Sequence, residues 1–245
     1  MATKNIIDIQ NFVMRFGANT VIDGLSFTVR KGETFGLLGS NGSGKTTTIR
    51  ALLGIYPPTA GKLLFDGAPY RVNSAVKLGY LPEERGLYKK EKVLDTMVYF
   101  GQLKGLLRHV AEERSLAYLR RVGLAEKAKS RLDKLSGGQQ QKVQLGITII
   151  DDPELLILDE PTKGFDPVNR RLLMEIIEEH QNKGATVVMI THQMEEVERL
   201  CDRILLLKDG KARAYGTVRD VKKKFGNRSL DDIFLSIYGE ENGNA

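Results

Sequence analysis

The chain has 245 residues, 41% of them hydrophobic and 28% charged, a balance typical of a soluble globular protein with a substantial core. No run approaches 18 consecutive apolar residues, and MATKNIIDIQ lacks the long apolar segment of a secretory signal, so we expect neither a membrane span nor secretion. The single cysteine, Cys201, excludes an internal disulfide and is expected to be a small core residue in a reducing compartment.

The net charge of +6 is concentrated in one internal segment. Residues 84–134 contain 13 Lys or Arg and 7 Asp or Glu, whereas the rest of the chain has 24 of each sign. A solvated helical face explains such a segment, and an approach to anionic lipid or to an acidic partner is the alternative.

The first third of the chain alternates apolar runs with turn signals. Two apolar clusters in residues 6–30, separated by GANT, predict an antiparallel pair of strands. ETFGLL at 33–38 is expected to be a short buried strand, and TTTIRALLGI at 46–55 to begin a helix. Another β segment is expected at 61–70, and a strand in KLGYLP at 77–82 is stopped by its proline.

Helices and strands alternate through the remainder. The apolar spacing over 93–122 is helical, which predicts a helical insert between the strand halves of one core. LLILDE at 155–160 is expected to be a buried strand, followed by a helix over 169–181 and a strand in ATVVMIT at 185–191. RILLLKDG and KARAYG then predict a closing β hairpin. The sequence therefore predicts an α/β fold.

A phosphate-binding loop is predicted within GLLGSNGSGKTTT, which has the spacing G-x-x-x-x-G-K-[ST]. Glycines let backbone amides close around phosphate oxygens, and the following helix directs its positive dipole end to the same place. Lys45 is expected to reach the β and γ phosphates, and the Thr46 hydroxyl to bind Mg²⁺. The expected nucleotide contacts are Gly39, Ser40, Asn41, Gly42, Ser43, Gly44, Lys45, Thr46 and Thr47.

Phe16 precedes Gly39 by 23 positions, far enough for a hairpin to return it to the nucleotide. Its ring is expected to stack on adenine, and packing within the hairpin is the alternative.

Polar residues follow two of the expected strands at the carboxyl edge of the sheet, where the loop strand also ends. Asp159 is expected to orient Mg²⁺, directly or through its water, and Glu160 to polarise the attacking water. A solvated loop start is the alternative for this acidic pair. His192 follows the next strand and is expected to contact the γ-phosphate, with a surface or capping role as the alternative.

LSGGQ opens the helix that continues as QQQKVQLGITII. Ser136 is a good helix cap, and the two glycines leave backbone amides free at a helix N-terminus. The sequence therefore predicts a second anion site here, with a simple cap as the alternative.

Over residues 5–220 these motifs resemble the nucleotide-binding subunit of an ATP-binding cassette (ABC) transporter, whose specific signature is LSGGQ. In that family the signature of one subunit closes over ATP held on the loop of a second. The resemblance implies ATP contacts from Leu135, Ser136, Gly137, Gly138 and Gln139. Phe16 resembles the adenine-stacking aromatic, Asp166 in KGFDP resembles the dimer-contact acid, and His192 resembles the switch histidine.

Two positions depart from the family pattern. Glu83 stands where a glutamine usually reaches Mg²⁺ and reports to the membrane subunit, and a carboxylate still suits Mg²⁺. Lys142 stands where an arginine commonly follows the signature, which keeps the charge and loses the planar fork.

The resemblance implies a P-loop NTPase core with a mixed sheet, an N-terminal antiparallel β subdomain and a helical subdomain inserted at about 84–148. We expect one ABC ATPase domain over 1–225 and a short C-terminal extension over 226–245. The implied activity is ATP hydrolysis with Mg²⁺, coupled to ATP-driven dimerisation of two cassettes and to a separate membrane permease. The implied location is cytoplasmic, peripheral on the inner face of the cell membrane. GYLPEERGLY and SLDDIFLSIYG resemble the branch that powers exporters of ions, drugs or lipids.

Cassette ATPases of chromosomes or repair and of the ribosome are the competing functions. The chromosome type needs a long coiled coil between the two halves of its site, and residues 84–134 lack sustained heptads. The ribosome type usually carries two cassettes, and this chain has one. Interleaved acids and the lack of an aromatic-rich basic groove argue against nucleic acid as a partner.

Overall fold

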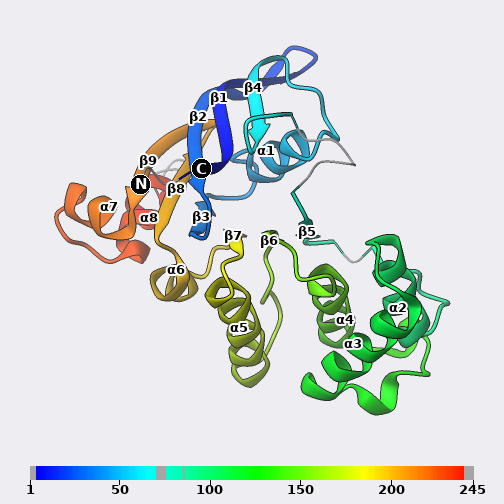
Figure 1. The fold of residues 1–245 in the computed structure, drawn as a ribbon. Helices are drawn as coiled ribbons and strands as arrows, with labels where there is room; N and C mark the ends of the chain where they lie inside the picture. Colours follow the sequence, from blue (N-terminus) through cyan, green and yellow to red (C-terminus); the bar gives the residue numbers. More distant parts are fainter. Residues whose placement is uncertain (1–3, 70–75, 85, 240–245) are drawn as a thin grey trace. The chain divides into compact units, whose positions relative to one another are not determined.

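The computed structural model describes residues 4–69, 76–84 and 86–239 (Figure 1). The chain divides into two compact units, which we call unit 1 (residues 1–76 and 184–245) and unit 2 (residues 77–183). Tyr70 of the expected β segment, Arg85 of the basic segment and the last six residues lie outside the described residues. The α/β fold predicted from the sequence is confirmed.

Unit 1 contains an antiparallel sheet built from β1 (Asn5–Phe16), β2 (Asn19–Arg30) and β4 (Ala60–Phe65), in the order β2-β1-β4. The apolar clusters of the sequence supply its buried face, on which Ile9, Phe12 and Ile22 are at most 1% exposed. The antiparallel β subdomain predicted near the N-terminus is therefore confirmed, and the GANT turn joins its first two strands.

A second sheet in unit 1 carries β7 (Thr186–Ile190), β3 (Thr34–Leu38), β8 (Arg203–Lys208) and β9 (Lys211–Thr217) side by side. β3 runs parallel to both β7 and β8, whereas β9 runs antiparallel to β8, so this sheet is mixed as predicted. All residues of β3 and β7 are buried, which fits the run of non-polar residues that follows the first threonine of each strand.

The helices of unit 1 are α1 (Lys45–Leu52), α6 (Met194–Leu200), α7 (Val218–Lys224) and α8 (Leu230–Tyr238). Leu230 and Ile233 of α8 join one core cluster with residues of α6 and β8. The Lys208 ammonium also donates to the Ile237 carbonyl at 2.8 Å. Cys201 lies in the same cluster, where burial raises the pKa of its thiol, so its predicted place in the core is confirmed.

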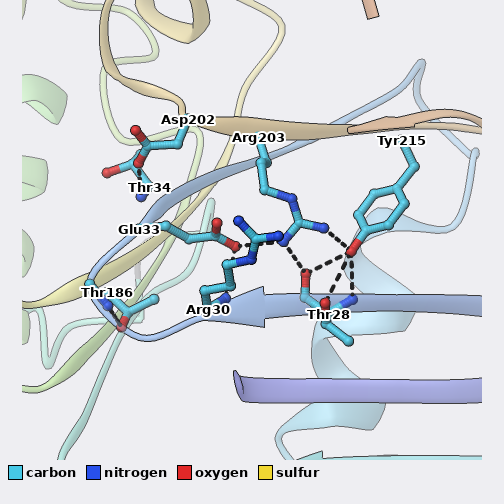
Figure 2. Close-up of polar contacts among 9 residues, drawn as sticks. Thr28, Arg30, Glu33, Thr34, Thr186, Asp202, Arg203 and Tyr215 are labelled. Atoms are coloured by element: carbon cyan, nitrogen blue, oxygen red, sulfur yellow. Dashed lines mark hydrogen bonds and ion pairs between the residues drawn. The ribbon is translucent and has the colours of Figure 1, made fainter. Parts of the chain in front are cut away.

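A buried ion pair in unit 1 belongs to a polar network that connects β8 and β9 with β2 of the other sheet. Arg203 of β8 lies 3.1 Å from Glu33, and both side chains are less than 10% exposed. Figure 2 shows Arg203 also bonded to the Thr28 carbonyl and to the Tyr215 hydroxyl. Tyr215 in turn accepts a hydrogen bond from the Thr28 amide at 3.0 Å. Burial raises the pKa of Glu33, while the Arg30 amide and Arg203 act in the opposite direction.

Unit 2 contains the parallel pair β5 (Leu78–Leu81) and β6 (Leu155–Asp159), with Leu81 opposite Leu158. Its helices are α2 (Val93–Leu103), α3 (Arg108–Arg121), α4 (Gly137–Ile149) and α5 (Pro167–Asn182), with short 3₁₀ turns η1 (Ala125–Lys127) and η2 (Leu132–Lys134).

The helical pattern predicted over 93–122 is confirmed, and two helices, α2 and α3, occupy this segment. Gly105 has φ +90, a left-handed conformation that ends the first helix, and Leu107 is extended before α3 begins. A Cβ at Gly101 would lie 2.7 Å from Ala111 Cβ, so glycine permits the close approach of these two helices. Among the described residues, no helix combines the length and apolar character needed to cross a membrane.

Candidate nucleotide-binding site

The predicted phosphate loop joins β3 to α1 in unit 1. Residues 39–44 connect the buried strand to the first residue of the helix, Lys45, as the motif requires. Asn41 and Gly42 are exposed, and the positive dipole end of α1 begins directly after Gly44. Strand, loop and helix thus stand in the arrangement that presents backbone amides to an anion.

Two glycines of the loop have a packing reason as well as a conformational one. A Cβ at Gly39 would lie 2.4 Å from the Leu207 carbonyl and 2.4 Å from Ser43 Oγ. Gly44 has φ +106, and a Cβ there would lie 2.4 Å from Ile22 of β2. Larger residues would therefore push the loop away from the strands that hold it.

Lys45 holds the loop closed in this structure. Its ammonium donates to the carbonyls of Gly39 and Ser40, each at 2.8 Å. Ser43 is 3% exposed, and its hydroxyl has no hydrogen-bond partner within the described part of the chain. A buried hydroxyl without a partner is costly, and a phosphate oxygen would provide the acceptor it lacks.

Thr46 and Thr47 follow Lys45 in the first turn of α1, and both are partly exposed. Thr48 is buried and donates to the Gly44 carbonyl at 2.9 Å. Thr46 and Thr47 thus lie at the end of the helix next to the loop, where Thr46 was predicted to bind Mg²⁺.

Phe16 lies at the end of β1, where its side chain is 47% exposed. Its ring meets Tyr56 edge to face, with centroids 5.4 Å apart, and Tyr56 follows α1 in the chain. The hairpin that carries Phe16 also contacts the loop through Ile22 and Gly44. Part of the Phe16 ring surface is thus open beside the loop helix, as adenine stacking requires.

His192 is placed beside the loop by strand register. Leu37 of β3 pairs with Ile190 of the parallel strand β7. His192 is exposed two residues beyond Ile190, as Gly39 is two residues beyond Leu37. The two residues therefore leave the same edge of one sheet at the same level.

Asp159 is the last residue of β6 in unit 2, and Glu160 directly follows it. They are 3% and 8% exposed, and the Gln141 side chain donates to the Glu160 and Pro161 carbonyls at 3.1 and 3.0 Å. Glu160 has φ +50, a left-handed conformation that is costly for a non-glycine residue and often marks functional sites. The backbone that carries its carboxylate is thus fixed by α4.

Glu83 reaches the same edge of unit 2, because it follows Leu81 of β5 just as Glu160 follows Leu158. Its carboxylate lies 2.6 Å from the Lys163 ammonium, and this contact raises the pKa of Lys163. Lys163 is therefore a neighbour of Glu83 that the sequence did not indicate.

The LSGGQ segment caps α4 in unit 2. Ser136 Oγ accepts from the Gln139 amide at 3.3 Å, and the Ser136 amide donates back to Gln139 Oε1 at 2.9 Å, which forms a capping box. Leu135 is 5% exposed and anchors the turn before the cap. The amides of Gly137 and Gly138 begin the helix, where backbone donors lack intrahelical acceptors. The predicted cap is confirmed, and the anion site stays a prediction.

Asp166 caps the next helix and lies close to the signature segment. Its Oδ1 accepts from the amides of Val168 and Asn169, both at 3.0 Å, and these contacts lower the pKa of its carboxyl. A Cβ at Gly138 would lie 3.2 Å from the ring of Phe165, the residue before Asp166. The two segments are therefore neighbours within unit 2. The helix begins at Pro167, two residues before the predicted start.

Lys142 has a structural contact. It is 9% exposed, donates to the Val122 carbonyl at 3.1 Å, and has a pKa lowered by burial. The lysine thus connects α4 to the end of α3.

The oxygen donors predicted for Mg²⁺ are Thr46 in unit 1 and Asp159 and Glu83 in unit 2. The described residues contain no group of three or more acidic, His or Cys side chains suited to a metal ion. A hydroxyl and two carboxylates are oxygen donors of the kind that Mg²⁺ takes, since this ion is commonly held through one or two carboxylates and completed by phosphates and water.

Comparison with known proteins gives the class of this chain. Residues 22–163 match the family described as ABC transporter. An uncharacterised ABC transporter ATP-binding protein of Methanocaldococcus jannaschii is 44% identical, over 90% of this chain and 81% of the relative. Nod factor export ATP-binding protein I of Rhizobium sp. (strain N33) is 39% identical, over 88% of this chain and 72% of the relative. A solved ATP-binding subunit of an ABC transporter superposes with a TM-score of 0.87 and 30% identity, covering 94% of this chain and 98% of that one.

The strand, loop and helix around Lys45 define a P-loop nucleotide-binding protein. The chain belongs to the ABC transporter family and is an ATP-binding subunit of that family.

Sequence reasoning missed two residues that shape the site. Gln141 holds the backbone at Glu160 and Pro161, and Lys163 binds Glu83. These contacts join positions 20 and 80 residues apart, and polar side chains at such separations carry no periodic signal. Lys163 has a partial signal, since it follows Glu160 within the same turn.

Proposed function

We propose that the chain hydrolyses ATP and powers an exporter through the pairing of two cassettes that act on a separate membrane permease. The observation that carries this proposal is the closed phosphate loop, in which Lys45 donates to two loop carbonyls and the Ser43 hydroxyl has no partner among the residues that the structure describes. Family membership supports ATP as the nucleotide.

The proposed chemistry divides among residues of both units. Lys45 and the loop amides bind the phosphates and stabilise their negative charge in both the ground state and the transition state. Glu160 accepts a proton from the attacking water, and His192 donates a hydrogen bond to the γ-phosphate. When bound, Mg²⁺ supplies positive charge at the phosphate oxygens.

The separation of two groups of amide donors supports the proposed pairing of cassettes. The loop supplies amides from one segment, and the signature at the start of α4 supplies amides from another. We propose that the signature of a second chain completes the loop of the first. A second copy of this chain, or a nonidentical cassette, provides the same chemistry.

The permease and the location are also part of the proposal. The Rhizobium relative is named for Nod factor export, which favours an exporter. We propose a cytoplasmic subunit held at the inner face of the cell membrane by an integral membrane partner. Purification of the tagged chain from membranes, with identification of the polytopic protein that accompanies it, tests this proposal. Recovery without any such protein would contradict it.

Replacing Lys45 by methionine is expected to weaken ATP binding about ten- to a hundredfold, because charge-assisted hydrogen bonds contribute about 1.5–3 kcal/mol. Calorimetric titration with ATP and Mg²⁺ measures the change. Lys62→Met, an exposed lysine of β4, is the matched control and should bind ATP normally. Unchanged affinity in Lys45→Met would refute the loop as the phosphate site.

The basic segment is proposed to face anionic lipid near the permease. Arg108, Arg120 and Lys127 are exposed in it, whereas Arg121 is bonded to Glu179 and is left out. Reversing these three charges to glutamate is expected to weaken vesicle binding at least about a hundredfold, at about 1 kcal/mol for each basic residue, and the effect should fade at high salt.

The control reverses Arg219, Lys223 and Lys224, which are exposed on α7. Co-sedimentation with vesicles that contain or lack acidic lipid, at low and high salt, gives the comparison. An equal loss of vesicle binding in both triple variants, or binding that does not depend on acidic lipid, would favour the alternative that the segment is a solvated helical face.

A further inference from the structure

Unit 2 contains a cavity of about 390 Å³ that the ATP chemistry does not use. It lies among α2, α3, α4 and α5, away from the helix starts that carry the signature and Asp166. Met97, Ile149 and Ile150, each at most 8% exposed, form an apolar floor. Hydrocarbon placed on this floor would leave water, which favours an apolar group there.

His180 on α5 also lines the cavity with its imidazole. It is 8% exposed, and its imidazole makes no hydrogen bond to any described residue. The ring nitrogens of His180 are not among the buried unpaired polar atoms of the described residues, so they face the cavity, where a ligand oxygen can take the place of water.

The charges around the cavity favour an anion. Arg114 is paired with Asp152 at 2.7 Å, and Arg121 is paired with Glu179. Lys183, at the end of α5, also lines the cavity and makes no ion pair with a described residue. The lining therefore has one more cation than anions when His180 is neutral.

We propose that this cavity binds a small amphiphilic carboxylate, with its oxygens on His180 and Lys183 and its hydrocarbon chain on the floor of Met97, Ile149 and Ile150. The proposal goes beyond ATP hydrolysis and does not rest on it, because the site lies at the opposite ends of α4 and α5. A ligand here contacts α4 and α5, the two helices that begin at Gly137 of the signature and at Pro167.

The test uses octanoate as the probe and the NMR signals of the three histidine side chains as the readout. Octanoate is expected to shift the His180 signal in a saturable manner while His109 and His192 remain unchanged. Octanol, which lacks the charge, and acetate, which lacks the chain, are expected to bind at least about tenfold more weakly. No saturable shift of His180, or equal binding of acetate or octanol, would overturn the proposal.

Variants separate this site from surface binding. Lys183→Met is expected to weaken octanoate binding about tenfold through loss of a charge-assisted hydrogen bond. Ala117→Phe, at an exposed position of α3 that lines the cavity, is expected to block binding by filling the space. Lys129→Met, exposed in the same unit and outside the cavity, is the matched control. Octanoate affinity unchanged in both cavity variants would refute the site.

The dependence on pH gives a second readout. Burial lowers the pKa of His180, and Lys183 and Arg121 lower it further, while Asp152 and Glu179 raise it. Arg114 is the remaining charged residue at the cavity. A bound carboxylate would favour the imidazolium and raise this pKa, so octanoate should bind more tightly as pH falls toward the lowered pKa of His180, as long as octanoate stays ionised. Affinity that rises with pH would contradict contact between the carboxylate and His180.

Discussion

Replacing Glu160 by glutamine is expected to slow ATP hydrolysis about 10²- to 10⁴-fold, because the amide cannot accept the proton of the attacking water. ATP affinity should stay near that of the unaltered protein, since the ground state makes no use of this proton transfer. The backbone at Glu160 is held by Gln141 through carbonyl contacts, so the substitution leaves these hydrogen bonds in place.

Phosphate release and calorimetric ATP titration together measure this effect. Glu154→Gln, at an exposed position just before β6, is the matched control and should hydrolyse ATP normally. Near-normal turnover in Glu160→Gln would show that Glu160 is not the general base. An equal fall in ATP affinity would show instead that the side chain supports the fold of the site.

Replacing Glu33 by leucine is expected to destabilise the protein by about 3–5 kcal/mol, because Arg203 remains charged and buried without its partner. At about 2–4 °C for each kcal/mol, the melting temperature should fall by roughly 10 °C. The double variant Glu33→Leu with Arg203→Met removes both charges and should recover most of the loss. Asp23→Ala, which breaks an exposed pair with Lys211, should cost about 0–1 kcal/mol.

Chemical denaturation of these variants separates an unpaired charge from lost packing. If the double variant is as unstable as Glu33→Leu, the loss comes from packing and the explanation is wrong. The single variant Arg203→Met gives a pH test, because burial already raises the pKa of Glu33 above its ordinary value of 4.5. Without Arg203 that pKa should rise further.

A carboxyl with a raised pKa in the folded state binds more protons folded than unfolded between the two pKa values. Its contribution to stability is therefore lost as pH rises through that interval. The deficit of Arg203→Met relative to the unaltered protein should widen as pH increases above 4.5. A stability deficit that stays constant across this pH range would show that removing the Arg203 charge does not change the pKa of Glu33.

The fold near the phosphate loop was predictable because its signals are local. Continuous apolar runs gave β3 and β6 their buried positions, and the fixed spacing from Gly39 to Thr46 placed the loop between strand and helix. The Ser136 cap was equally local, since a serine before two glycines and a glutamine is a capping pattern.

Other features depended on contacts between distant segments. Apolar spacing continues across the α2–α3 boundary, so it did not reveal the left-handed Gly105. The packing of Leu230 and Ile233 against β8 and α6 was likewise not predicted, because it depends on how the chain returns to that sheet. Gln141 and Lys163 entered the site only through the structure, whereas the residues that carry motifs were predicted from their spacing.

Our central proposal is that the signature of one chain completes the ATP-binding site formed by the phosphate loop of another. Light scattering of the Glu160→Gln protein, with and without ATP and Mg²⁺, measures the molar mass that tests it most directly. We expect a monomer without nucleotide and a dimer with ATP, and a monomer in both conditions when Ser136→Arg is added to block the signature. A Glu160→Gln protein that stays monomeric across micromolar concentrations, with ATP demonstrably bound, would contradict pairing of this chain with itself.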